Sequence, residues 1–535
     1  MKTNIYLILW LSLAGLMHAS TATPAPFGFV RGIVCILEPA DLSATPREGA
    51  GFDASRTPVL QDQEVATLME PYIGAPLSPE LSELAAATLR FWLQQQGHSF
   101  VTVYVPPQDV THGVLRIVVQ RAKLDGPLQI EGAKYFSEAS YRAAVPLAAG
   151  DEIDAAAVQA GIDRLNRDGY RRVVVAAEPG ATSGTTKLVL RTLETRPWNL
   201  TAGYNNSGTA VTDESRVSAG WSWGNAFGRG DTLGYNLSAD PKFAHSVIHA
   251  GNYGTTFESG HSLVFFGSYA TIESALPAPL TQEGTSWQAG ARFGVPLSKT
   301  AGGWERSLSF AADFKYSDNT LEFAAIPITD NVTHIAQFGA TVSASRRGET
   351  HRVGFSASLF ASPGGLTGRN DDAAFGASRA GATADYVYGR FEMQFAQQLA
   401  RGFSWNSTLS SQFSSGPLLG MEQLNGAGVS GVRGYRESTA FGDEGVLVNN
   451  ELHLPTFSLF KARDQADFFV FLDAAALHNL GPFGDTTQLV ASGVGLNHRF
   501  GRAFMLRAAY GWQLKELPAA SGGNSHGHIS ATVSF

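Results

Sequence analysis

The last 340 residues alternate between apolar and polar side chains, and this period of two limits the possible folds more than any other feature of the sequence. Trp198, Leu200 and Tyr204 alternate with polar or small residues, and residues 216–223 and 504–514 follow the same pattern. A period of two is typical of a β-strand with one apolar face. Strands of about ten residues, with aromatic residues at their ends, favour a transmembrane barrel over a soluble β-sandwich.

We count sixteen candidate strands between residue 196 and the end of the sequence. Their expected starts lie near residues 196, 213, 230, 244, 261, 285, 305, 333, 351, 382, 403, 446, 466, 487, 503 and 527. The 340 residues therefore supply about 21 per strand with its connection, which suffices for tilted spans of about 9–11 residues plus turns. Because lipid tolerates no unpaired strand edge, the sheet must close on itself. The sequence thus predicts a mostly β chain in which residues 196–535 form a 16-stranded transmembrane β-barrel.

The composition agrees with a surface that faces lipid, and it excludes several classes of protein. Charged residues make up 16% of the chain, against about 25% in a typical soluble protein. The net charge of −8 argues against nucleic acid as a partner, since phosphate binding needs a basic surface. Cys35 is the single cysteine, so no disulfide can form within the chain.

No motif indicates a cofactor, a metal or a nucleotide. His526 and His528 lie two residues apart without other clustered ligands, which makes a metal site improbable. The pattern G-x-x-x-x-G-K-[ST], which binds nucleotide phosphates, is absent. Residues 220–224 match the G-x-S-x-G pattern of hydrolases, but they lie inside an alternating strand, whereas that motif requires a sharp strand-to-helix turn. We therefore expect a protein that is not an enzyme and that has no cofactor.

The N-terminus predicts export from the cytoplasm. Lys2 precedes an apolar run from Ile5 to Met17, and small residues follow up to Ala22. This is the pattern of a signal peptide over residues 1–22. The apolar run has 13 residues, fewer than the ~18 that a membrane-spanning helix needs.

Residues 27–195 combine helical and stranded patterns in the order β-α-α-β-β, and this order occurs twice. In the first unit, residues 27–122, we expect strands at 27–37, 99–105 and 113–119 and helices at 62–70 and 78–97. In the second unit, residues 123–195, we expect strands at 128–131, 170–177 and 185–193 and helices at 137–145 and after Asp154. Each unit is long enough for a small α+β domain, with helices on one face of a three-stranded sheet.

A family resemblance enters at the end of the first unit. The run Val105-Pro106-Pro107-Gln108-Asp109, followed by Gly113, resembles the closing hairpin of polypeptide-transport-associated (POTRA) domains in the translocators of two-partner secretion, the TpsB family. Pro179-Gly180 occupies the equivalent place in the second unit, and Arg196-Pro197-Trp198 resembles the start of that family's barrel. The resemblance implies two periplasmic POTRA domains, at residues 27–122 and 123–195, before the barrel.

The chain differs from the family at the N-terminus. Some members carry a helix before the first POTRA domain, and this helix inserts into the barrel. Here four residues lie between the predicted cleavage site and Phe27, whereas an insertion at residues 38–58 enlarges the first β-α loop. This difference argues against a helical plug.

Two further motifs lie in the predicted barrel. The connection at residues 415–445 contains Val432-Arg433-Gly434-Tyr435, which resembles the VRGY motif of the sixth barrel loop in these translocators and their wider assembly superfamily. Connections of this length without regular structure are usually functional. Phe471-Leu472-Asp473 resembles the F-x-D motif on the barrel wall of the same proteins.

We expect the 415–445 loop to fold into the lumen, where Arg433 binds Asp473 and closes the resting channel. The alternation of the strand turns Phe468, Val470 and Leu472 toward lipid and Asp473 inward. A planar guanidinium can hold a carboxylate with two hydrogen bonds, whereas lysine offers a point charge. The alternative is that Arg433 is a solvated loop residue and Asp473 an isolated charge in the lumen.

The final strand alternates up to Phe535, which resembles the terminal signal read by the machinery that inserts outer-membrane barrels. An ordinary edge strand that ends in Phe is the alternative. As a whole, the resemblance implies a monomer in outer-membrane lipid. This monomer would export a large, unfolded, β-rich partner protein to the cell surface without ATP, and it would bind the cargo at POTRA strand edges.

Three other functions stay open at this point. An assembly factor of the same superfamily would usually have more POTRA domains. A passive porin would need no POTRA domain at all. An outer-membrane hydrolase would need a serine and a histidine paired on adjacent strands. A haemolysin, an adhesin or a contact-dependent toxin would each fit as the exported partner.

Overall fold

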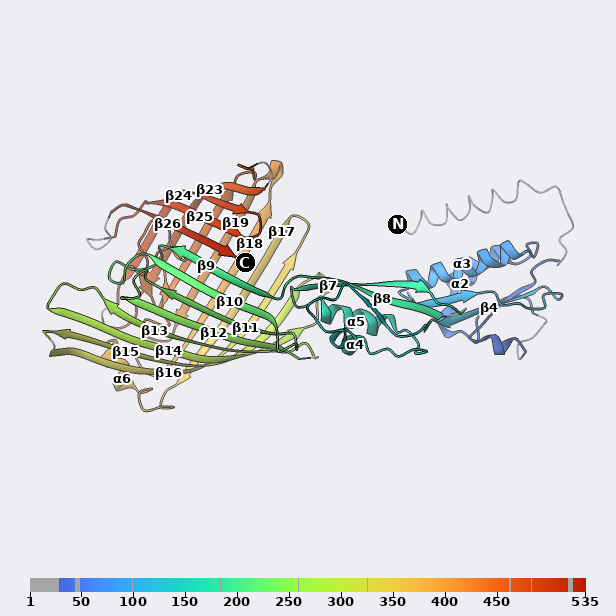
Figure 1. Ribbon diagram of the computed structural model, residues 1–535, viewed down its shortest axis with the longest axis horizontal. Coiled ribbons are helices and arrows are strands. Elements are labelled where there is room, and N and C mark those ends of the chain that lie inside the picture. The colour runs from blue at the N-terminus through green and yellow to red at the C-terminus, as the bar shows by residue number, and fades with distance from the viewer. Residues whose placement is uncertain are drawn as a thin grey trace. The chain divides into compact units, whose positions relative to one another are not determined.

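The computed structural model describes residues 28–43, 49–98, 100–182, 185–257, 259–324, 326–460, 463–482, 484–517 and 523–535. The chain divides into two compact units, Met1–Thr195 and Arg196–Phe535 (Figure 1). The predicted signal peptide, residues 1–22, lies outside the described residues. Among the helices of the described part, none has the length and apolar character that a bilayer crossing requires.

The first subdomain of unit one is a sheet with two α-helices. Its elements are β1 (Gly32–Ile36), η1 (Pro39–Leu42), β2 (Gly51–Asp53), η2 (Pro58–Leu60), α2 (Gln63–Met69), η3 (Glu70–Tyr72), α3 (Pro79–Gln95), β3 (Val101–Tyr104) and β4 (Val114–Arg121). The strand order is β2-β1-β4-β3, with β1 parallel to both of its neighbours. Ser78 begins α3 by accepting a hydrogen bond from the N–H of Leu81 at 3.1 Å. The helix then buries Leu89 and Leu93 in one core with Ile33 and Leu115 of the sheet.

The second subdomain repeats this plan. Its elements are β5 (Lys123–Leu124), β6 (Gln129–Glu131), α4 (Glu138–Ala144), α5 (Ala155–Leu165), β7 (Arg171–Pro179) and β8 (Thr185–Glu194). The central strand β8 pairs with β5, β6 and β7. Asp154 caps α5 by accepting a hydrogen bond from the N–H of Ala156 at 2.9 Å, and Ile162 of this helix joins the core with Leu190 of β8.

The prediction of three-stranded sheets is wrong by one short strand in each subdomain. β2 has three residues and lies within the 38–58 insertion, and β5 has two residues. Segments this short cannot display a period of two, and their place in the sheet depends on backbone pairing alone. The other predicted helices and strands of both subdomains are confirmed.

The second unit is a closed barrel of sixteen strands, as predicted. These are β9 (Trp198–Asn205), β10 (Arg216–Ala226), β11 (Asp231–Ala239), β12 (Ser246–Thr256), β13 (Ser262–Ser274), β14 (Leu280–Leu297), β15 (Glu305–Phe323), β16 (Ile326–Arg347), β17 (His351–Pro363), β18 (Asp385–Gln398), β19 (Ser404–Ser414), β22 (Glu444–His453), β23 (Asp464–His478), β24 (Thr486–Phe500), β25 (Phe504–Gln513) and β26 (Ser525–Ser534). The barrel closes where residues 530–534 of β26 pair with residues 201–205 of β9.

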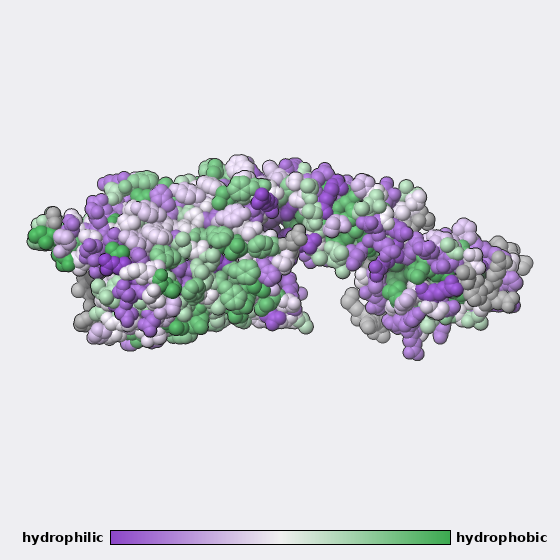
Figure 2. Space-filling view, turned by 90° about the horizontal axis from the view of Figure 1, so that it is seen from below, coloured by the Kyte–Doolittle hydropathy of each residue, from purple (hydrophilic) through white to green (hydrophobic). Residues whose placement is uncertain are grey.

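The two faces of the barrel differ in polarity. Trp221 and Tyr235 lie opposite each other across β10 and β11, and their side chains point outward. In the adjacent pair, Gly220 lies opposite Asn236, whose side chain points inward. Figure 2 shows apolar residues gathered over the outer face of this unit. An apolar exterior around a polar interior is the pattern of a barrel that crosses a membrane.

The sequence analysis predicts no helix within residues 196–535, and this is wrong in the connection between β17 and β18. This connection holds the helix α6 (Asp372–Ser378), which Asp371 caps by accepting a hydrogen bond from the N–H of Ala374 at 2.9 Å. Seven residues are too few for a helical period to stand out from the strands around them. The turn before β19 forms η4 (Ala400–Gly402), and the loop before β22 holds the short pair β20 (Leu424–Asn425) and β21 (Phe441–Gly442).

Glu194 ends β8 and ties the segment before α4 to the sheet. Its carboxylate accepts hydrogen bonds from the N–H groups of Lys134 at 2.6 Å and Tyr135 at 2.5 Å, and from the hydroxyl of Tyr141. Partial burial raises the pKa of Glu194, but the hydrogen bonds from Tyr141 and the backbone lower it more, so the pKa lies below its ordinary value. Burial, together with the bond to Glu194, raises the pKa of Tyr141 to about 12.

We predict that Glu194→Gln destabilises the second subdomain by about 1–2 kcal/mol, because a neutral amide accepts weaker hydrogen bonds than a carboxylate. The folded pKa lies below the unfolded one, so this stabilisation is present above the unfolded pKa and is lost as the pH falls through the folded pKa. Protease sensitivity of residues 134–195 during heating of the detergent-purified protein measures the effect. Acidification below pH 4.5, the ordinary Glu value, should destabilise the wild type more than the variant. An equal acid response in both would contradict this assignment.

Candidate functional site

The long connection between β19 and β22 turns back into the barrel lumen. We call residues 415–443 the lumen loop. Its tip closes tightly, since the N–H of Val432 donates to the carbonyl of Gly426 at 2.8 Å and that of Gly431 to the carbonyl of Gly428 at 3.1 Å. The tip contacts inward-facing side chains of β22, β23 and β26. The barrel wall therefore surrounds a segment that the sequence places between two of its strands.

The strongest contact of the loop tip is an ion pair between Arg433 and Asp473 of β23. The Nε atom donates to Oδ2 at 2.7 Å and Nη2 donates to Oδ1 at 2.8 Å, so the guanidinium holds both carboxylate oxygens. The backbone N–H of Arg433 adds a third bond to Oδ2 at 3.2 Å. Arg433 is 4% exposed and Asp473 is fully buried. This planar, two-pronged contact is one that arginine can make and lysine cannot.

Glu451 of β22 and Arg507 of β25 complete the charge balance. Nη1 of Arg433 and Nη2 of Arg507 both bond to Oε1 of Glu451. Two cations and two carboxylates thus share one cluster, in which Arg433 and Asp473 are buried and Arg507 is partly exposed, with no charge left over among the four. We call the contacts of Arg433 with Asp473 and Glu451 the latch.

Two phenyl rings cover the guanidinium groups. Phe471 lies two residues before Asp473 and therefore on the same face of β23, and the Arg433 Cζ atom lies 3.8 Å from its ring centroid. Phe469 lies 4.7 Å from the Cζ atom of Arg507. A Cβ atom at Gly493, on the neighbouring strand, would overlap the Phe471 ring. The F-x-D motif thus supplies both an anion and an aromatic surface for the loop arginine.

The other residues of the VRGY motif fit the loop against the wall. Gly434 has a φ of +92°, and a Cβ atom there would lie 3.0 Å from the carbonyl carbon of Gly511. A side chain at this position would therefore be strained and would push the loop off β25. The hydroxyl of Tyr435 accepts from the N–H of Val490 at 3.2 Å and lies 3.1 Å from the Val490 carbonyl oxygen. Val432 is fully buried in an apolar cluster with Leu477 and Leu489.

Sequence reasoning missed several residues that take part in this site. Besides Glu451 and Arg507, they include His528, whose Nε2 accepts from the N–H of Gly434 at 3.3 Å, and His453, which contacts Glu451 at 3.0 Å. The alternation of each strand gives the inward direction of such side chains. It does not give the register that brings Glu451 opposite Phe471, and this register decides which inward residues meet.

The predicted POTRA hairpin motif lies between β3 and β4. Gln108 mimics a strand partner, because its Nε2 donates to the carbonyl of Arg116 at 2.6 Å and its Oε1 accepts from the N–H of Arg116 at 2.8 Å. Asp109 accepts from the N–H of Thr111 at 3.0 Å and so forms the turn. Gly113 has a φ of +73°, and its carbonyl accepts from the N–H of Arg31 at 2.7 Å. Pro106 is buried and Pro107 is exposed.

Phe535 follows the last residue of β26 and lies beside β9. Its N–H donates to the carbonyl of Leu200 at 2.8 Å, and its side chain is exposed.

Within the described residues, no group of three His, Cys, Asp or Glu side chains could hold a metal ion. The contacts that hold the loop tip in place are hydrogen bonds and ion pairs.

Comparison with known families matches residues 184–498 to the family described as haemolysin secretion/activation protein ShlB/FhaC/HecB. Residues 50–121 match the POTRA domain of ShlB type. The outer membrane transporter CdiB of Dickeya dadantii is 22% identical over 406 residues, which cover 72% of this chain and 68% of that protein. The hemolysin transporter protein ShlB of Serratia marcescens is 25% identical over 308 residues, 55% of this chain and 52% of that protein.

Among solved structures, CdiB from Escherichia coli aligns with a TM-score of 0.67 and 17% identity. The alignment covers 97% of this chain and 92% of the CdiB chain. At this level of identity the likeness shows a shared fold.

We predict that the two hydrogen bonds from the Arg433 guanidinium to Asp473, and not a positive charge alone, hold the loop tip in the lumen. Thiol labelling of a Val432→Cys variant reports on the tip, because Val432 is fully buried while the loop is seated. Addition of Arg433→Lys should raise the labelling rate about tenfold, since one charged hydrogen bond replaces two. The native Cys35 does not interfere, because burial and the nearby Asp53 raise its pKa to about 12.

Ser430→Cys serves as the matched control, because Ser430 lies in the same loop but is exposed. Its labelling rate should stay the same with and without Arg433→Lys. Equal labelling of the Val432→Cys thiol with Arg433 and with Arg433→Lys would mean that the two guanidinium hydrogen bonds do not hold the tip in place.

Proposed function

The chain belongs to the haemolysin secretion/activation family ShlB/FhaC/HecB, and from this membership we propose that it exports one large partner protein by two-partner secretion without ATP. The protein is an outer-membrane transporter, with its barrel in the membrane and its POTRA domains in the periplasm. The latch between Arg433 and Asp473, inside a closed barrel, carries this proposal further than any other observation. A porin that passes solutes freely has no need of a loop fixed by a buried charge cluster.

The lumen wall away from the latch suits the passage of an extended polypeptide. A cavity of about 430 Å³ runs along the inner faces of β9–β14. Its uncharged polar lining includes Asn199, Thr201, Ser222, Asn236, Asn252, Ser268 and Gln288. Amide and hydroxyl side chains can exchange hydrogen bonds with any peptide backbone, so such a wall makes little demand on cargo sequence.

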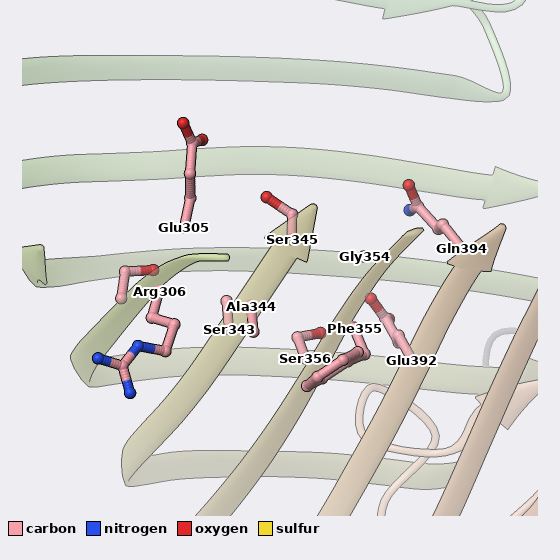
Figure 3. A pocket seen from close by; sticks show the side chains of 11 residues that line it. Glu305, Arg306, Ser343, Ala344, Ser345, Gly354, Phe355, Ser356, Glu392 and Gln394 are labelled. Atoms are coloured by element: carbon pink, nitrogen blue, oxygen red, sulfur yellow. The ribbon is translucent and has the colours of Figure 1, made fainter. Parts of the chain in front are cut away.

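A second cavity continues this wall across β15–β18. It has a volume of about 420 Å³, and its lining combines Ser343, Ser345, Ser356 and Gln394 with the charged side chains of Glu305, Arg306 and Glu392 (Figure 3). The serine and glutamine side chains come from three adjacent strands, so hydroxyl and amide groups also line this part of the lumen. We infer that cargo moves along the uncharged lining of the β9–β14 cavity, away from the buried charges of the latch.

Strand edges in the periplasmic unit offer a place for cargo to bind first. In the described part of the chain, β3 pairs with β4 alone and β7 with β8 alone. The free side of each strand carries main-chain donors and acceptors, to which an extended segment can add as a further strand. Such binding suits an unfolded, β-rich partner. Folding of this partner outside the cell could then make export irreversible without ATP.

We predict that Arg433→Ala abolishes export while the barrel still inserts, because the variant leaves Asp473 buried without its partner and unseats the loop tip. The readout is the amount of the partner protein in the culture medium; we expect the neighbouring reading frame to encode this partner. Heat-modifiable migration on gels verifies that the barrel is folded. Arg292→Ala is the matched control, because Arg292 pairs with Asp313 in the wall and contacts none of the latch residues in the described part of the chain. Normal export by the Arg433→Ala variant would remove this mechanism.

Deletion of residues 27–195 separates a transporter from a passive porin. The proposed transporter loses all export without its POTRA domains, because the barrel then receives no cargo. A porin would conduct ions unchanged, and no exported product would be lost. Ion conductance in planar bilayers and export into the medium, measured on the same variant, decide between the two.

A further inference from the structure

Glu422, in the stem of the lumen loop, is buried against a part of the wall that the latch does not reach. It is 1% exposed. Its carboxylate forms an ion pair with Lys315 of β15 and accepts hydrogen bonds from the hydroxyl of Tyr388 at 2.6 Å and from Nε2 of Gln337 at 3.3 Å. These partners lie on three different strands, so the wall provides a fitted site for one loop carboxylate.

The backbone of the same residue is also held. The carbonyl oxygen of Glu422 accepts from Nη2 of Arg390 at 2.9 Å and from Nε2 of Gln412 at 3.0 Å. Five side chains from β15, β16, β18 and β19 thus converge on a single loop position. A solvated loop residue would have no need of such a set, and neither the VRGY nor the F-x-D motif includes any of these residues.

The neighbouring residues of the stem are fixed in the same region. Asp443, at the other end of the loop, is fully buried and forms two bonds with Arg379, from the connection that carries α6. Leu418 packs in an apolar cluster with Phe375 of α6 and Tyr388. Glu422 and Leu418 of the stem therefore contact β15–β19, whereas the tip contacts β22–β26, and β15 lies six strands away from β23 around the barrel. Asp443 also reaches β23, since its N–H donates to the carbonyl of His478 at 3.0 Å.

We propose that Glu422 is a second anchor, a positioning residue that holds the stem of the lumen loop to the wall formed by β15–β19. The loop then crosses the lumen and is bound to the barrel wall on two sides, and closure of the channel requires both the latch and this anchor. Removal of Glu422 would leave the Lys315 cation buried without its partner, which strongly favours release of the stem. The inference about closure rests on the proposed function, but the contact of stem and wall can be tested by itself.

Thiol labelling tests the anchor directly. Leu418→Cys places a reporter in the stem, where Leu418 is 1% exposed, and Val432→Cys places one in the tip. We expect Glu422→Ala to raise labelling of the stem thiol about tenfold or more, as expected for the loss of charged hydrogen bonds, and to leave labelling of the tip thiol unchanged. Exchange of the two charges, Lys315→Glu with Glu422→Lys, should restore slow labelling of the stem. Unchanged stem labelling, or an equal rise at both thiols, would overturn the proposal.

Asp313→Ala is the matched control for a buried inward carboxylate. Asp313 lies two residues before Lys315 on β15 and pairs with Arg292 inside the wall, so its loss should leave stem labelling unchanged. Glu422→Gln keeps hydrogen-bonding groups without the charge, and it replaces Glu422→Ala if heat-modifiable migration shows a misfolded barrel. With this variant too, stem labelling should rise, and an unchanged rate would overturn the anchor.

Conductance in planar bilayers separates this proposal from the proposed function. If stem labelling rises and the channel conducts more, both stand. If stem labelling rises while conductance stays at the wild-type level, the anchor stands, and the idea that closure requires the anchor fails. If Arg433→Ala raises conductance but Glu422→Ala changes neither labelling nor conductance, the anchor fails, and the proposal that the latch keeps the channel closed stands.

Discussion

The ion pair between Arg433 and Asp473 is the contact on which the interior of the barrel depends. Asp473 is fully buried, and a buried carboxylate is costly unless a cation and hydrogen bonds compensate it. The required cation comes from a loop, so the loop must enter the lumen for the wall to be satisfied. Glycines at positions 434 and 511 allow the two backbones to approach closely enough for this contact. The buried carboxylate of Asp473 thus links the folding of the barrel to the position of the lumen loop.

The need to pair charges also divides the lumen into two parts. The wall near the latch carries Glu451, Asp473 and Arg507, which are bonded to the loop or to one another. The wall of β9–β14 carries amides, hydroxyls and glycines around an open cavity. Under the proposed function, the loop occupies the charged side of the barrel and an exported polypeptide, which needs only backbone partners, uses the other. This division follows from where the strands place their charged residues.

Much of this architecture was predictable because it depends on local patterns. Alternation gave the sixteen strands and the inward direction of Asp473, and caps at Ser78 and Asp154 gave helix starts. The short strands β2 and β5 and the helix α6 were missed because such brief segments carry no measurable period. Glu422 was missed for a different reason. The partners of its carboxylate lie 34 to 107 positions away along the chain, on strands whose register only the closed barrel defines.

The energetics of buried ion pairs bear on how such a loop can both close and release. An ion pair in a protein interior contributes little net stability, because the loss of hydration offsets most of the attraction. Breaking it by removal of one partner is costly, yet exchange of one set of hydrogen-bonding partners for another is not. A loop held by charge-assisted hydrogen bonds is therefore firmly placed while the lumen is empty. Under the proposed function, a polypeptide backbone or water displaces the loop by supplying substitute hydrogen bonds.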